Sequence, residues 1–232
     1  MGSVTSSRLG HGGHSKIYAL PIIFYGYRDI VDLDEAELRI NLLSDGLFEG
    51  SGLSSSGFSA GPNVKVDFGR RAFGSGVRGP GNVGTSVEVG GFASYRYGPA
   101  RLRLRARHDV ANGHGGTVAE LDLRSGLYRN GGLGIAAQVG VSWADKRYMQ
   151  SLFGVTPAQS TPTLAPYSPG ADIKALRGSL SGEYKFSGGW SAAASVQFVR
   201  RVGDASRSPV VTARGSANRL NTGMFLLYTF GQ

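Results

Sequence analysis

Residues 97–132 read YGPARLRLRARHDVANGHGGTVAELDLRSGLYRNGG, and charged and apolar residues alternate in two parts of this stretch. From 101 to 107 every second residue is an arginine, and the residues between them are apolar. From 119 to 124 the acidic residues Glu120 and Asp122 alternate with apolar residues in the same way. A period of two is typical of a β-strand, because successive side chains point to opposite faces. The stretch therefore predicts a hairpin with carboxylates opposite arginines on one face and apolar residues on the other.

The same alternation recurs along most of the chain. It predicts further strands over 16–28, 35–42, 58–69, 86–97, 133–143, 176–186, 190–201 and 219–230. Together these segments give about ten strands, with eight or twelve as alternatives, and no convincing helix. The 37 glycines fit a chain with many turns and disfavour a mainly helical protein.

Composition bounds the organisation of the chain. Residues 16–232 are expected to form one domain, whereas residues 1–15 are polar and are expected to be disordered, or a remnant of an upstream strand or of a replaced leader. The absence of cysteine excludes disulfides and thiolate metal sites. No apolar run reaches the roughly 18 residues that a membrane-spanning helix needs, which excludes a helical membrane protein.

The connections between the expected strands alternate in length. Long connections at 70–84, 145–172 and 202–218 and a medium one at 108–116 alternate with short ones at 98–99, 129–132 and 187–189. Long and short loops then fall at opposite ends of the sheet, as in outer-membrane barrels. Only the expected loop at 44–56 is long where a short one would fit.

A period of two fits a soluble barrel as well as a membrane barrel, so other features must decide which face meets water. The charged face also carries glycine and other small residues, and aromatic residues cluster at strand ends. The strands are about ten residues long, which is the length that a tilted strand needs to cross a bilayer. We therefore expect an all-β fold, a closed antiparallel up-and-down transmembrane β-barrel whose apolar face meets lipid.

The arginine row then lies in the lumen, where two interpretations remain open. It forms either an ion-pair network with the nearby acids or a wall that attracts anions. The residues of this charge wall are Arg101, Arg103, Arg105, Arg107, Glu120, Asp122 and Arg124.

The connection 145–172 contains aromatic residues and four prolines, and it is expected either to contact a partner or to form a lid over the pore. The residues that carry this hypothesis are Tyr148, Met149, Phe153 and Tyr167.

An enzyme of this class would need a carboxylate, a histidine and a nucleophile in the outer loops. The candidates are His108, Asp109, His114, Asp145, Ser151 and Ser168. Nothing in their spacing brings them together, so we predict no catalytic, cofactor or metal site. The net charge of +9 could suggest nucleic acid, but the arginines alternate with leucines inside a sheet, so we predict no nucleic-acid partner.

Several stretches in a fixed order carry a resemblance to a known family. They are YALPIIFYGYRD, GPNVKVDFGRR, HGG at 114–116, YMQSLFGVTPAQS, LAPYSPGADIKA, GDASRSPVV and the closing YTF. From about residue 16 to 230 the chain resembles the MipA/OmpV family of Gram-negative outer-membrane proteins. The resemblance implies an outer-membrane barrel, and we expect this barrel to be a monomer embedded in outer-membrane lipid. For the namesake of the family, it also implies a scaffold that links a murein-degrading lytic transglycosylase to a murein synthase. Other members resemble adhesins or porin-like proteins, so a surface adhesin or a small pore, which the arginine row would make anion-preferring, stays an alternative.

Overall fold

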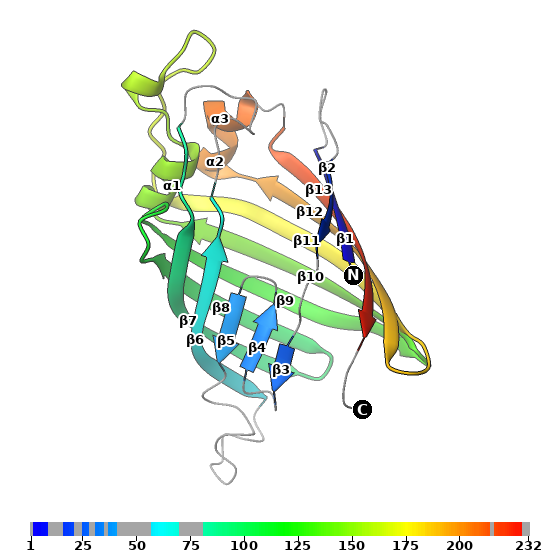
Figure 1. Ribbon diagram of the computed structural model, residues 1–232. Helices are drawn as coiled ribbons and strands as arrows, with labels where there is room; N and C mark the ends of the chain where they lie inside the picture. Colours follow the sequence, from blue (N-terminus) through cyan, green and yellow to red (C-terminus); the bar gives the residue numbers. More distant parts are fainter. Residues whose placement is uncertain are drawn as a thin grey trace.

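The protein is described here by a computed structural model, shown in Figure 1. The structure describes residues 2–8, 16–20, 25–27, 31–34, 37–40, 57–69, 81–213 and 216–228, with side chains from residue 57 to 226 within those ranges. The expected loop at 44–56 lies outside the described residues.

All thirteen described strands belong to one antiparallel sheet. They are β1 Gly2–Arg8, β2 Lys16–Leu20, β3 Tyr25–Tyr27, β4 Val31–Asp34, β5 Glu37–Ile40, β6 Phe58–Asp67, β7 Ser86–Tyr97, β8 Ala100–Asp109, β9 Thr117–Asn130, β10 Leu133–Ala144, β11 Asp172–Lys185, β12 Trp190–Arg201 and β13 Asn218–Tyr228. From β3 to β13 each strand pairs with the next along the chain, and β13 then pairs with β1, which pairs with β2. The prediction of an all-β, up-and-down sheet is confirmed, and the eight strands β6–β13 correspond to predicted segments.

The N-terminal segment differs from the expectation of disorder. Residues 2–8 form β1, which pairs with β13 from Gly2 opposite Phe225 to Arg8 opposite Arg219. For this segment the sequence left an upstream strand open as an alternative to disorder. Composition concealed it, because the strand reads GSVTSSR, which has no aromatic residue and only two β-branched residues, Val4 and Thr5.

The two ends of the strand order are held close together by the chain itself. β2 and β3 stand at opposite ends of the order, yet only residues 21–24 separate them in sequence. Five extended Cα–Cα steps span at most about 18 Å, whereas thirteen strands laid flat would span about 58 Å. The sheet must therefore curl back on itself, and Figure 1 shows this curvature.

The two faces of the curled sheet carry apolar and charged side chains in the opposite arrangement to that of a soluble protein. On the outer face, Leu104 is 51% exposed and Val139 is 58% exposed. On the inner face, Glu88 and Arg107 are each 2% exposed. The alternation seen in the sequence thus places apolar side chains outside and charged side chains inside.

Connections of different length lie at opposite ends of the sheet, as predicted. The short turns join β7 to β8, β9 to β10 and β11 to β12 at one end, which we call the turn end. The longer connections, including 110–116, 145–171 and 202–217, lie at the other end, which we call the loop end. At the turn after Asn130, Gly131 adopts φ 53°, a left-handed conformation that glycine tolerates well.

Short helices form a cap over the loop end (Figure 1). They are α1 Lys146–Phe153, a 3₁₀ turn Pro157–Gln159, α2 Gly203–Arg207 and α3 Pro209–Thr212. The prediction of no helix was therefore wrong for the long connections. The Asp145 carboxylate starts α1 by accepting a hydrogen bond from the Tyr148 N–H at 2.8 Å. Among the described residues, no helix has the length and apolar character needed to span a membrane.

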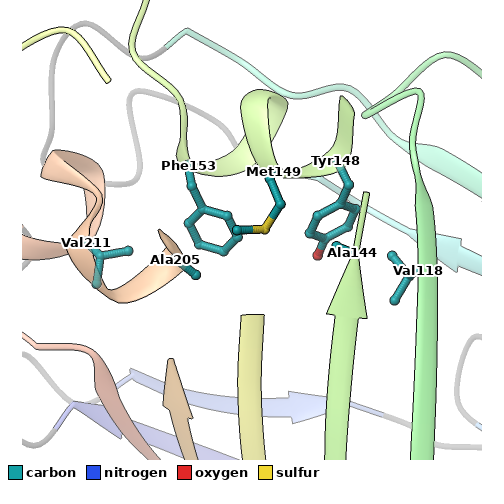
Figure 2. Packing of buried hydrophobic residues seen from close by; sticks show 7 residues of the cluster. All are labelled: Val118, Ala144, Tyr148, Met149, Phe153, Ala205 and Val211. Atoms are coloured by element: carbon teal, nitrogen blue, oxygen red, sulfur yellow. The ribbon is translucent and has the colours of Figure 1, made fainter. Parts of the chain in front are cut away.

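The cap contains the main buried hydrophobic cluster of the described residues (Figure 2). Its members come from the start of β9, the end of β10 and the three helices, and they are Val118, Ala144, Tyr148, Met149, Phe153, Ala205 and Val211. A second cluster of Val155, Leu164 and Val210 lies in the same connections. Hydrophobic packing thus ties two long connections to the end of the sheet.

We predict that Met149→Ala loosens the cap. Met149 has no exposed surface, so its truncation should remove about 2–5 kcal/mol of packing free energy. Limited proteolysis of the folded full chain in detergent should then cut within residues 145–171 faster than in the wild type. Lys146→Ala, an exposed change in the same helix, is the control. Equal cleavage rates for both variants would show that the cap does not depend on this cluster.

Candidate functional site

The inner face carries its charges where β8 meets β9. In the register of these strands, Arg105 lies opposite Glu120 and Arg103 lies opposite Asp122. This confirms the predicted hairpin with acids opposite arginines. Because all four side chains stand on the same face of adjacent strands, their charged groups can meet.

Two carboxylates at the centre of the inner face are shared among three arginines. Glu120 accepts from Arg107 at 2.7 Å and from Arg177 at 2.5 Å, and Arg105 Nη2 lies 3.4 Å from it. Asp122 accepts from Arg105 at 2.5 Å and from Arg177 at 3.0 Å. We call the residues Glu88, Arg105, Arg107, Glu120, Asp122 and Arg177 the central network. Charges this deeply buried require such pairing, because an unpaired buried charge is strongly unfavourable.

The central network extends toward the loop end through Glu88 and His114. Arg107 Nε donates to Glu88 Oε2 at 2.8 Å, and His114 Nε2 lies 3.1 Å from Glu88 Oε1. The Gly116 N–H donates to His114 Nδ1 at 3.1 Å, so Nδ1 carries no proton. His114 is therefore the tautomer with the proton on Nε2, which donates to Glu88.

Sequence reasoning missed three partners in this network. Glu88 and Arg177 each occupy a polar position of a predicted strand, but their contacts depend on strand order. Gln138 Nε2 donates to Asp122 at 3.3 Å from β10. The period of two could have placed all three on the inner face, although it could not have shown which charges meet.

The arginine row is divided between two environments. Arg105, Arg107 and Arg177 form ion pairs at the centre of the inner face, and Arg207 forms one in the cap. Arg101 lies opposite Arg124 in the register, and neither residue takes part in those ion pairs. The row is thus paired near the centre and becomes purely basic toward the turn end.

The residues singled out in the long connection lie in the cap. Tyr148, Met149 and Phe153 are buried in the hydrophobic cluster, while Tyr167 is partly buried and donates its hydroxyl to the Asp204 carbonyl at 2.9 Å. The Tyr148 hydroxyl accepts from Lys174 Nζ at 2.7 Å, and burial raises the pKa of Tyr148. These side chains hold the cap to the sheet.

The polar residues considered for catalysis make structural contacts. The Ser151 hydroxyl donates to the backbone carbonyl of His114 at 2.9 Å, and Ser168 donates to Gln150 at 3.3 Å. His108 lies on the outer face, where its Nδ1 is 3.0 Å from the Thr117 hydroxyl.

The two acidic candidates bind backbone N–H groups. Asp109 accepts from the backbone of Ala111, His114 and Gly115, which shapes the loop after β8. Asp145 caps α1. Within the described part of the chain, no three His, Cys, Asp or Glu side chains are grouped so that they could hold a metal ion.

An up-and-down sheet with an apolar outer face and a paired, charged inner face is typical of β-sheet proteins of the outer membrane. The family model described as MltA-interacting protein MipA matches residues 1–230, so the chain belongs to the MipA family. This confirms the family resemblance seen in the sequence, and proteins of this family are associated with the outer membrane. No curated protein matches the chain.

We predict that Glu120→Gln destabilises the fold strongly. The change leaves three arginines around a neutral amide, and breaking a buried ion pair from one side costs about 3–5 kcal/mol. Denaturant titration of the refolded chain should show the loss.

Glu183→Gln provides the matched control for this experiment. Glu183 also lies on the inner face, but its carboxylate takes no part in the hydrogen bonds and ion pairs of the described residues. Equal stability of the two variants would contradict the role assigned to the central network.

Proposed function

We propose that the chain is a closed, monomeric twelve-strand β-barrel in the bacterial outer membrane. Its single domain comprises β1 and residues 16–232. The inverted distribution of apolar and charged side chains is the observation that carries this proposal. Counting β2 and β3 as parts of one strand reduces thirteen strands to twelve, which agrees with the even number usual for such barrels. Closure also satisfies the backbone groups at both sheet edges, which hydrocarbon would otherwise leave unpaired.

Exposed aromatic side chains at the turn end support this orientation. Tyr97, Tyr184 and Trp190 are 79%, 50% and 45% exposed, and each lies beside a short turn. Aromatic residues form girdles where a barrel crosses the membrane surface. The turn end would then face the periplasm, together with the C-terminal end of β13.

We predict that Leu104→Arg destabilises the protein in lipid. Leu104 lies in the middle of β8 on the outer face, where an arginine near the bilayer midplane costs about 2–4 kcal/mol. Denaturant titration of protein refolded into phospholipid vesicles should measure this loss. Val110→Arg serves as the control, because Val110 is 59% exposed, against 51% for Leu104, but follows the strand. A Leu104→Arg protein as stable as the control would argue against a lipid-facing outer face.

The function that we propose is that of a scaffold for murein-processing enzymes. The family description names an interaction with MltA, and we extend it to a lytic transglycosylase and a murein synthase bound together. The cap and the central network occupy much of the inner face, which favours surface contacts over the passage of solutes. A barrel whose loop end and centre are occupied by packed side chains offers a rigid support in the membrane.

Size-exclusion chromatography of the detergent-folded chain tests this function. When it is mixed with a purified MltA-type lytic transglycosylase and a murein synthase, all three proteins should elute as one complex. The two enzymes mixed without the chain are the control. Failure of either enzyme to bind the chain would contradict the scaffold proposal.

The second candidate is a small anion-preferring pore, favoured by a cavity of about 650 Å³ that reaches the turn end. Planar-bilayer recording separates the candidates. A scaffold should show negligible conductance. An anion-selective current that is reduced by Arg103→Ser together with Arg105→Ser would instead establish the pore.

A further inference from the structure

The cavity at the turn end lies between β9, β10, β11 and β12, and we call it the turn-end chamber. Its volume is about 650 Å³, and it extends from the inner face to the turn residues Pro99, Gly131 and Gly132. This volume lies within the range of roughly 300–1,000 Å³ that is usual for small-molecule sites.

The inner wall of the chamber is built from small residues. Gly134, Ala136, Ser181 and Ala193 line it, and a Cβ atom built at Gly134 would meet no atom within 4 Å. The sequence thus leaves open space at the turn end of the inner face, whereas arginines and carboxylates occupy its centre.

The charged groups of the chamber lack the pairing of the central network. Arg124, Arg129, Glu183 and Lys185 line it, and their side chains take no part in the hydrogen bonds and ion pairs of the described residues. Three cations face one carboxylate, so the chamber has an excess of positive charge.

A row of like charges adds to this excess. Arg96 of β7 lies opposite Arg101 of β8, which lies opposite Arg124 of β9. Directly opposed residues have Cβ atoms about 4.5–5.5 Å apart, and like charges in such pairs are destabilising. An anion bound beside Arg124 would relieve this repulsion.

We propose that the turn-end chamber binds a small soluble polyanion that carries carboxylate or phosphate groups. The planar guanidinium groups of Arg124 and Arg129 can each bind such a group through two parallel hydrogen bonds, and Lys185 adds a point charge. The small wall residues leave room for the body of the ligand. The opening at the turns admits it from the side that faces the periplasm in the proposed orientation. This binding activity is separate from the scaffold function and does not depend on it.

Isothermal titration calorimetry tests the proposal on the full chain, folded in non-ionic detergent at low ionic strength. Citrate and inorganic pyrophosphate are the probes, and they distinguish carboxylate from phosphate recognition. At least one of them should bind. Arg124→Gln combined with Arg129→Gln should weaken that binding at least tenfold. If neither probe binds, the proposal is overturned.

Arg147→Gln is the control for charge, because Arg147 is exposed on α1 at the opposite end of the sheet. Its affinity for the probe should equal that of the wild type. If this single change weakens binding as much as the double change in the chamber, the probe responds to net charge, and the proposal fails.

A steric variant tests the location independently of charge. Gly134→Leu should fill the chamber and abolish binding. Gly178→Leu is its control, because a Cβ at Gly178 also meets no atom within 4 Å but this residue alternates with the inward Arg177 and faces outward. Retention of a shifted gel mobility before boiling verifies that each variant is folded. Unchanged binding by folded Gly134→Leu would place the anion elsewhere and overturn the proposal.

Discussion

Glu120 lies where three guanidinium groups converge, two from β8 and one from β11. Much of the molecule follows from the need to pair these charges inside the sheet. When a residue of a strand points its charge to the inner face, the residues before and after it point to the outer face. The residues between the charges must therefore be compatible with the environment outside the sheet. At the centre of the sheet these residues include Leu102, Leu104, Leu121 and Leu123, and all four are exposed. The same residues that carry the interior ion pairs therefore fix the apolar exterior.

Local patterns in the sequence were enough to predict the strands β6–β13, the asymmetry of the connections and the two-faced character of the sheet. They failed where structure depends on distant contacts. α1 is only eight residues long. It is held in place by its N-cap residue Asp145 and by packing against β9, β10 and α2. Arg177 meets Glu120 across 57 positions of sequence, so a period of two could place it on the inner face without identifying its partner. His114 was considered for catalysis, yet it links Glu88 to the loop backbone.

Along the strands, the described inner face is divided into three layers, and a different kind of interaction dominates in each. Hydrophobic packing dominates at the loop end, paired charges occupy the centre, and small residues with unpaired cations surround the turn-end chamber. Each layer draws on a different set of strands, from β7–β11 at the centre to β9–β12 at the turn end. Support of the sheet and binding of a ligand can therefore reside in separate parts of one interior.

The pairing of β1 with β13 has a consequence for biogenesis. Gly2 lies opposite Phe225, so this pairing joins residues more than 200 positions apart in sequence. Contacts of such large sequence separation form slowly, because a long loop must close before they contribute. The neighbouring hairpins from β6 to β13 can form from local contacts, whereas the pairing of β1 with β13 requires a long-range contact. Until β1 and β13 pair, each of these strands keeps an open edge, and an open strand edge promotes aggregation.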